Sequence, residues 1–147
     1  MRKSLVISLF VLLAAACSRG TVRNEKEAEE CAVGFMEKFF SFNFPDAENL
    51  CTSDTRYWIT WYVSNITPAD VDSIHRIPDA PKVSLRSVEA EDGDTTAVAY
   101  CEVENFYRLD SLGRHGHMVQ KDVLRLPMRM ECGEWRVRME GPLQSER

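Results

Sequence analysis

Two ionisable side chains and one phenol offer the clearest acid–base chemistry in this chain. Asp72 and His75 are three residues apart, a spacing that makes them neighbours on one face of a helix. A histidine beside a carboxylate can act as a general base near neutral pH, and Tyr57 is a further candidate. The same pair also occurs on ordinary solvent-exposed helix faces, so both interpretations stay open.

Metal or cofactor chemistry has weaker support. His115 and His117 flank a glycine in a predicted turn, and two imidazoles can begin a zinc site. Such a site needs a third or fourth ligand, and none lies nearby in the sequence. We therefore expect an exposed loop, with no metal and no cofactor.

Aromatic residues form the third group of candidates. Trp58, Trp61, Tyr62 and Tyr100 could line the mouth of a pocket and stack on a flat ligand. The alternative is that these residues belong to an ordinary aromatic core.

The Cys17 thiol follows a run of residues typical of an export signal. Arg2 and Lys3 precede an apolar stretch over residues 5–16, which ends in Ala-Ala-Ala. This stretch is shorter than the ~20 residues that a spanning helix needs. It resembles a bacterial lipoprotein signal, which implies cleavage before Cys17 and acylation of that residue. Palmitate is expected among the attached acyl groups. The alternative is an ordinary signal peptide with an incidental cysteine.

Four cysteines remain, and they allow three complete disulfide pairings: Cys31, Cys51, Cys101 and Cys132. Cys31 and Cys51 lie on consecutive predicted helices, at equal distance from the break near residue 41. We predict a disulfide between these two and a free, buried Cys101. The alternative is that all four are reduced.

Composition and charge limit the classes of partner. Of 147 residues, removal of 1–16 leaves 131, enough for one domain. The removed segment holds two basic residues and no acid, so the net charge changes from −5 to −7. This acidic balance argues against nucleic acid and anionic lipid surfaces as general partners, since both require concentrated Lys and Arg. We expect a flexible tether over 17–24, a single domain over 25–141 and a tail over 142–147.

Four helices are predicted in the first half of the chain. Apolar residues recur at helical spacing over 25–41, and Asn24 followed by Glu27 resembles a capping box. Further helices are predicted over 45–52, 55–65 and 68–76. The aromatic and β-branched content of 55–65 also suits a strand, but that segment shows no alternation of period two. The last begins with Thr67 as cap and an acid three residues later.

Strands are predicted in the second half. Residues 83–91 and 94–109 flank Asp92-Gly93, a two-residue hairpin signal. Residues 118–131 and 134–140 are joined by a turn at 132–133. In that register Met130 opposes Trp135, Met128 opposes Val137 and Leu126 opposes Met139, which places the apolar residues on one face. Pro127 interrupts the pattern and predicts a bulge or an unpaired edge.

The predicted strands carry apolar or basic residues on the face that does not pack on the helices. The 94–109 segment is apolar on both sides, which indicates helices on one face and partial cover, such as a second subunit, on the other. Five cations share the polar face of the last two strands: Lys121, Arg125, Arg129, Arg136 and Arg138. Arg129 opposes Arg136, which is repulsive unless an acid or a bound anion lies beside them. The neighbouring Glu131 and Glu134 could neutralise the pair, and the alternative is that an acidic partner or ligand docks there.

Helices followed by an antiparallel sheet define an α+β fold class. The chain resembles the nuclear-transport-factor-2-like (cystatin-like) superfamily, and more narrowly the envelope lipoproteins of its lumazine-binding-like branch. The features that carry the resemblance are the 25–41 helix, Ala47-Glu48-Asn49-Leu50-Cys51, the 64–67 joint, Asp92-Gly93 and the 133–137 strand. It implies a curved sheet wrapped by helices into a cone with an apolar pocket, in a superfamily that contains both enzymes and binding proteins.

The sequence therefore predicts a lipid-anchored cell-envelope domain of non-catalytic type, in the outer membrane if the host has one. It would bind a small apolar ligand or a partner protein. The first alternative is a small isomerase or hydrolase that uses Asp72, His75 or Tyr57. The second is a structural module that forms a homodimer through its sheet face.

Overall fold

The computed structural model describes residues 22–109 and 114–146. Helices come first and an antiparallel sheet follows, which confirms the α+β class. The elements are α1 (Glu25–Phe40), α2 (Phe44–Glu48), α3 (Ser53–Ser64), α4 (Pro68–His75), β1 (Lys82–Ala90), β2 (Thr96–Arg108), β3 (His117–Glu131), β4 (Glu134–Val137) and β5 (Gln144–Ser145). The predicted signal peptide, Cys17 and the start of the tether lie outside the described residues.

Helix α1 is the central helix of the fold. Its apolar stripe is buried as the periodicity predicts: Ala28, Cys31, Ala32, Phe35, Met36, Phe39 and Phe40. The predicted capping box at its start is wrong, because Asn24 adopts a left-handed conformation (φ 49°) and its side chain caps nothing. The helix ends before Phe42, which also has a positive φ of 61°.

The remaining helices are short, and two begin with proline in the first turn, where its missing N–H costs nothing. Helix α2 ends at Glu48, earlier than predicted, because the chain turns to run beside β4. Cys51 forms a parallel bridge with Val137, and Thr52 N donates to Val137 O at 2.9 Å. The capping box of α4 is confirmed, with Thr67 and Asp70 exchanging hydrogen bonds.

The sheet is a meander in the order β1-β2-β3-β4, with β5 beside β3. Its first hairpin differs from the prediction. A two-residue turn at Asp92-Gly93 would pair Glu91 with Asp94, but Glu91 N donates to Thr96 O at 3.1 Å. The loop is therefore longer, and the Thr96 hydroxyl closes it by hydrogen bonds with the Asp92 backbone.

The hairpin between β3 and β4 is confirmed in its register. Met128 pairs with Val137 and Met130 with Trp135 across a two-residue turn. Cys132 and Gly133 both have positive φ, 51° and 79°, as a turn of this type requires.

Pro127 determines where β4 ends. The Pro127 carbonyl accepts from Arg138 N at 2.8 Å, but proline has no N–H to donate back to the Arg138 carbonyl. The predicted pairing of Leu126 with Met139 does not form: the β3–β4 pairing ends at Val137, and Met139 N donates to Thr55 Oγ at 2.9 Å. Residues 138–143, the C-terminal arch, therefore leave the sheet.

The chain returns to the sheet after the arch. Strand β5 pairs with Leu124 and Arg125 of β3, so the residues after 141 belong to the fold instead of forming a tail. Arg108 Nη1 donates to Asp122 Oδ2 at 2.8 Å and to Ser145 Oγ at 3.0 Å, and Ser145 also donates to Asp122. These contacts fix the far end of the arch.

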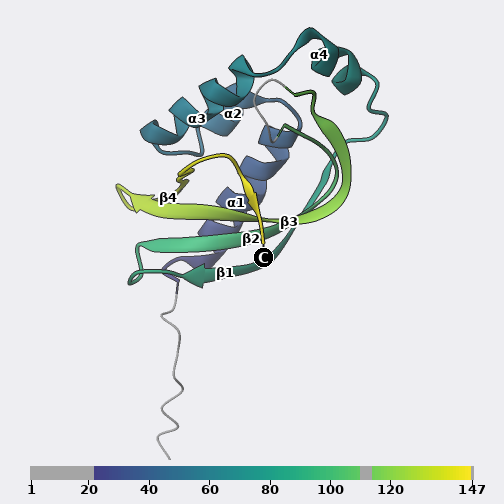
Figure 1. Cartoon of the computed structure of the whole chain (residues 1–147). Coiled ribbons are helices and arrows are strands. Elements are labelled where there is room, and N and C mark those ends of the chain that lie inside the picture. The colour runs from purple at the N-terminus through teal and green to yellow at the C-terminus, as the bar shows by residue number, and fades with distance from the viewer. Residues whose placement is uncertain (1–21, 110–113, 147) are drawn as a thin grey trace, which may run out of the picture.

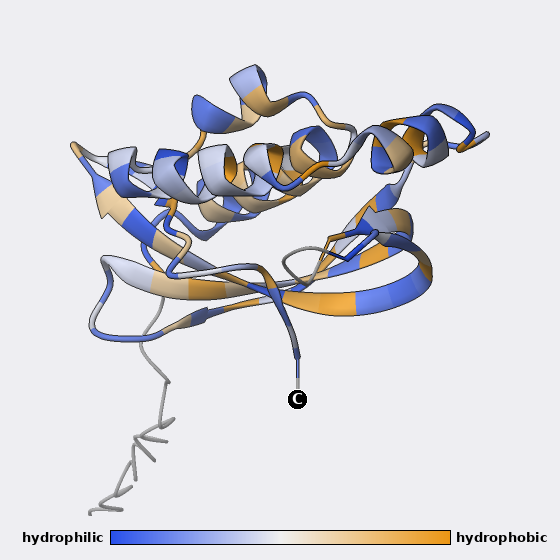
Figure 2. Cartoon of the chain, turned by 45° about the horizontal axis from the view of Figure 1, so that its top comes forward, coloured by the Kyte–Doolittle hydropathy of each residue, from blue (hydrophilic) through white to orange (hydrophobic). Residues whose placement is uncertain are grey.

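The sheet has a core face and an outer face, and all four helices lie on the core side (Figure 2). The core face of β2 carries Ala97, Ala99, Cys101 and Val103, each 0% exposed. Near the end of β2, Asn105 has a positive φ of 56°, which breaks the alternation so that Phe106 and Tyr107 are both buried. From there β2 and β3 curve over toward α4 (Figure 1).

The β3–β4 turn generates a stability prediction. Cys132 is exposed and left-handed, a conformation that costs most residues about 1 kcal/mol but that asparagine tolerates. We expect Cys132→Asn to raise the free energy of unfolding by about 0.5–1 kcal/mol in urea titrations. Cys132→Val should lower it, because a β-branched residue is strained there. Equal effects of the two substitutions would contradict the argument.

Candidate functional site

The space between the helices and the core face is filled by side chains. Phe39, Tyr62 and Trp135 are each at most 7% exposed, and Phe39 and Tyr62 have ring centroids 4.7 Å apart. The cavity that remains at the mouth of the cone has a volume of about 20 Å³. That is room for roughly one water molecule. The apolar pocket implied by the resemblance is therefore closed in this structure.

The four predicted pocket residues do not meet. Trp58 and Trp61 are half-buried on α3 with centroids 6.1 Å apart, whereas Tyr62 belongs to the core. Tyr100 alternates along β2 with the core residues Ala99 and Cys101, so it lies on the outer face. The structure thus divides this group between α3, the core and the far side of the sheet.

The acid–base candidates all lie at the surface. Asp72 and His75 are exposed on α4, and Tyr57 is 68% exposed on α3. His117 is exposed, and so is His115, whose Nδ1 lies 3.4 Å from Thr67 Oγ. Within the described part of the chain, no cluster of three metal-ligating side chains occurs.

Cys31 and Cys51 are buried free thiols, and the Cys31 thiol donates to the carbonyl of Leu50, the residue before Cys51. Burial raises the pKa of each thiol to about 11, and the neighbouring Cys51 raises the pKa of Cys31 further. Cys101 is free and buried, as predicted, and burial raises its pKa to about 12. All three are therefore protonated at neutral pH and poor nucleophiles. The disulfide between Cys31 and Cys51 stays a prediction.

The most strongly organised polar group is the Asp70 carboxylate, which is 0% exposed. Its Oδ1 accepts from Tyr107 Oη at 2.7 Å and from Gly116 N at 2.8 Å. Its Oδ2 accepts from Thr67 N at 2.8 Å and from Thr67 Oγ at 2.7 Å. Four donors from α4, β2 and the start of β3 thus surround one charge.

These contacts set the ionisation of the cluster. Burial alone would raise the pKa of Asp70, but the hydrogen bonds from Tyr107, Thr67 and Gly116 outweigh it and hold the pKa well below its usual range. Burial and the neighbouring carboxylate raise the pKa of Tyr107 to about 12. A β-carbon at Gly116 would lie 2.3 Å from the Tyr107 ring, so only glycine fits there. Sequence reasoning found the Thr67–Asp70 cap but not this role.

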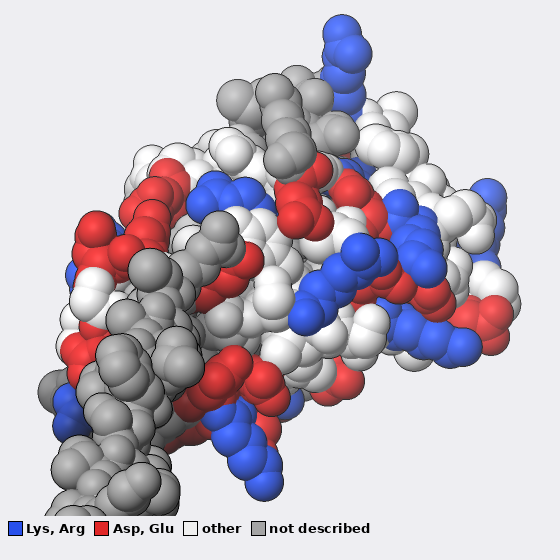
Figure 3. Space-filling model, turned by 90° about the horizontal axis from the view of Figure 1, so that it is seen from below, with Lys and Arg blue, Asp and Glu red and all other residues white. Residues whose placement is uncertain are grey.

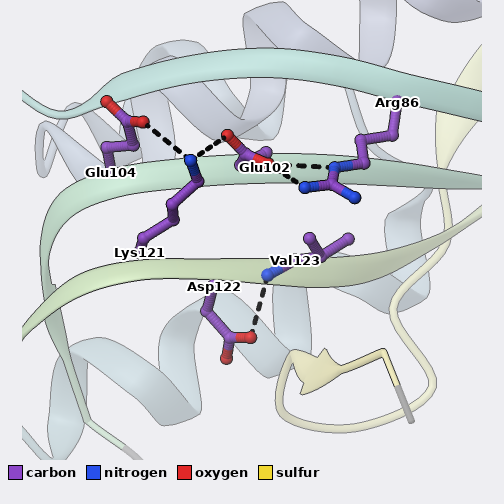
Figure 4. Close-up of polar contacts among 6 residues, drawn as sticks. All are labelled: Arg86, Glu102, Glu104, Lys121, Asp122 and Val123. Carbon is purple, nitrogen blue, oxygen red and sulfur yellow. Dashed lines mark hydrogen bonds and ion pairs between the residues drawn. The ribbon is translucent and has the colours of Figure 1, made fainter.

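The outer face carries a network of ion pairs across three strands (Figure 4). Glu102 of β2 accepts from Arg86 Nε of β1 at 2.9 Å and lies 3.0 Å from Lys121 Nζ of β3. Lys121 also lies 3.4 Å from Glu104. This end of the outer face is a neutralised, solvated surface.

The other end of the outer face carries the predicted arginines. Arg129 opposes Arg136 as expected, and each is paired with its own acid, Glu131 and Glu134. Arg136 also donates to the Asn49 carbonyl. The expectation that neighbouring acids neutralise this pair is confirmed.

Arg125 differs from these neighbours because it forms no ion pair with a described residue. It lies half-buried on β3, opposite Tyr100 and Gln144. A cleft of about 240 Å³ opens beside it, beneath the C-terminal arch. The residues that line this cleft are Arg125, Pro127, Met139, Glu140, Gly141, Pro142, Leu143 and Gln144. We name it the arch cleft. It combines one guanidinium, which no described acid pairs, with a lining of both polar and apolar residues.

Comparisons with known proteins identify no relative: no family model, no curated protein and no solved structure matches the chain. Among the described residues, no helix combines the length and apolar character needed to cross a membrane.

The Asp70 cluster predicts a pH-dependent stability. The unfolded carboxyl takes up a proton near pH 4, before the native one does, so acid favours the unfolded state. Stability should therefore be fully present above about pH 5 and fall as the pH drops below about 4. Asp70→Asn should cost about 3 kcal/mol near pH 7 and flatten this dependence.

Tyr107→Phe provides the matched comparison for Asp70→Asn. It removes a single donor and should cost about 1.5–3 kcal/mol while keeping most of the acid sensitivity. Urea titrations from pH 3 to 8 measure both effects. An unchanged pH slope in Asp70→Asn would show that other carboxylates dominate the acid response.

Proposed function

We propose that the protein is a lipid-anchored cell-envelope domain of non-catalytic type that binds a small ligand in the arch cleft. The ligand combines an apolar body with one anionic group. The membrane anchor is the acylated Cys17, and residues 17–24 tether it to the fold. The tether enters at β4, where Trp135 Nε1 donates to Arg23 O at 2.6 Å.

The observation that carries the proposal is the position of Arg125. Its half-buried guanidinium borders the arch cleft without an acid partner among the described residues. A carboxylate bound there would form charge-assisted, bidentate hydrogen bonds. Pro127, Met139 and Leu143 supply apolar walls for the rest of the ligand. Glu140 is an exposed acid at the same cleft, so it favours a single anionic group over a polyanion.

The alternatives receive less support from the same surface. The acid–base residues of an isomerase or hydrolase, Asp72 and His75, are exposed on α4 and do not line the arch cleft. Homodimerisation through the outer face would take the solvated ion pairs of Glu102, Lys121 and Arg86 out of water. Kinship with the nuclear-transport-factor-2-like superfamily remains a proposal. What supports it is the order of helices followed by a strongly curved antiparallel sheet.

A soluble aromatic acid tests the arch cleft directly. We expect full-length protein in nonionic detergent to bind 4-(trifluoromethyl)benzoate, observed by fluorine NMR. Arg125→Gln should weaken binding about tenfold or more, the value of one hydrogen-bonded charge. The exposed Arg56→Gln is the control and should leave binding unchanged. The neutral 4-(trifluoromethyl)benzyl alcohol corrects for uptake by micelles. Equal binding of acid and alcohol would contradict the proposal.

The anchor is tested separately in a bacterial host. Labelled palmitate should enter the wild-type chain and be absent from Cys17→Ser, because the acylated thiol is lost. Cys132→Ser controls for acylation of an exposed thiol elsewhere and should retain the label. A labelled Cys17→Ser chain would show that the lipid is attached at another residue.

A further inference from the structure

We propose that the free edge of β1 binds an extended, basic segment of a partner protein as an added strand. This surface is distinct from the arch cleft, and the proposal does not depend on a ligand there. The opposite edge of the sheet is covered: Cys51 bridges Val137 of β4, and β5 pairs with β3. In the described part of the chain, β1 is the terminal strand and pairs only with β2.

The first half of β1 directs unused backbone groups outward. The Thr96 carbonyl accepts from the residue 91 amide at 3.1 Å, so the backbone N–H and C=O groups of the even-numbered residues of β2 point toward β1. Ser84 is the register partner of Glu102, so the backbone groups of Ser84 point toward β2. Its neighbours Val83 and Leu85 therefore point their N–H and C=O groups away from the sheet. Such groups are a template for another strand.

The bulge at Arg86 limits the length of this template. The register shifts between Leu85 and Ser87, which separates residues 82–85 from the rest of β1. Bulges are one of the devices that protect an edge from indiscriminate pairing. The Arg86 side chain folds onto Glu102, away from the free edge, and leaves the first half accessible. We therefore expect a short added strand.

Two open clefts flank this half, between β1 and α1. The first has a volume of about 470 Å³ and is lined by Glu37, Pro81, Lys82, Val83, Ser84 and Glu104. The second, of about 390 Å³, is lined by Glu29, Glu30, Val33, Gly34, Glu37 and Leu85. Apolar side chains of an added strand can enter beside Val33 and Leu85. In Figure 1 β1 is the lowest strand, and the view from below in Figure 3 shows uncharged surface bordered by charged side chains.

The charges around the clefts select the partner. Glu29, Glu30 and Glu37 of α1 form no ion pair with a described residue, and Lys82 is the one cation in the lining. A second copy would bring its own three glutamates against these. A basic strand instead places Lys or Arg beside them, where each opposite-charge pair is favourable. Charge thus favours a basic partner over a second copy.

The test uses a peptide of alternating lysine and valine, blocked at both ends, and full-length protein in nonionic detergent. Calorimetry should give a measurable affinity, and amide NMR signals of residues 83–85 should shift. The same peptide with glutamate in place of lysine should not bind. Absence of binding at millimolar lysine–valine peptide would overturn the proposal.

Val83→Pro tests the strand pairing. It deletes an outward N–H at an edge position, where proline is tolerated, and should abolish peptide binding. Val83→Ala is the matched control, which loses packing but keeps the N–H and should bind. If Val83→Pro fails to fold, a peptide N-methylated at alternate residues replaces it and should not bind. Full binding by Val83→Pro or by the N-methylated peptide would overturn the proposal.

The charge preference is tested on the three glutamates of α1. Combining Glu29→Gln, Glu30→Gln and Glu37→Gln should weaken peptide binding at least fivefold. The control replaces three exposed acids elsewhere, Asp54→Asn, Asp72→Asn and Asp94→Asn, and should change peptide binding less than twofold.

The oligomeric state completes the test. Ultracentrifugation should find a monomer in detergent. A dimer abolished by Val83→Pro would identify a second copy as the occupant and overturn the proposal. The arch-cleft proposal would be unaffected by any of these failures.

Discussion

The buried Asp70 carboxylate is the contact on which the shape of the fold depends. A charge without exposure to water is tolerated only when hydrogen bonds replace its hydration, and four donors do so here. Two of them, Tyr107 and Gly116, belong to the curved end of the sheet, and Thr67 supplies the others from the start of α4. Because all must converge on one group, β2 and β3 bend toward the helices, and the left-handed Asn105 permits that bend.

The bend has a consequence for function. It brings Phe106 and Tyr107 against the aromatic residues of α1 and α3, with Phe40 and Phe106 centroids 4.7 Å apart, and so fills the cone. Binding surfaces must then lie outside the core. Two irregularities of the sheet create them: Pro127 releases the arch from β3, and the bulge at Arg86 leaves half of β1 as a short free edge. In both cases the interruption of regular pairing opens the space.

Local sequence patterns predicted the elements well, and long-range contacts explain the failures. The 25–41 periodicity and the 132–133 turn depend on neighbouring residues, so α1 and the Met128–Val137 register were predictable. The Thr67–Asp70 cap was visible for the same reason. The role of Asp70 was not, because Tyr107 and Gly116 are 37 and 46 residues away. Likewise, aromatic content could not reveal that Tyr100 and Tyr62 lie on opposite faces of the sheet.

The two proposed surfaces have opposite charge preferences on one sheet, and the ion-pair network explains how they stay separate. Arg125 lies on β3 toward the arch, whereas the acids of α1 border β1. Between them, Glu102 and Lys121 neutralise the outer face across three strands. Exposed charges are screened beyond about 10 Å, roughly two strand spacings, so the acids of α1 weaken the field of Arg125 little. An anionic ligand and a basic strand can therefore occupy the same domain at once.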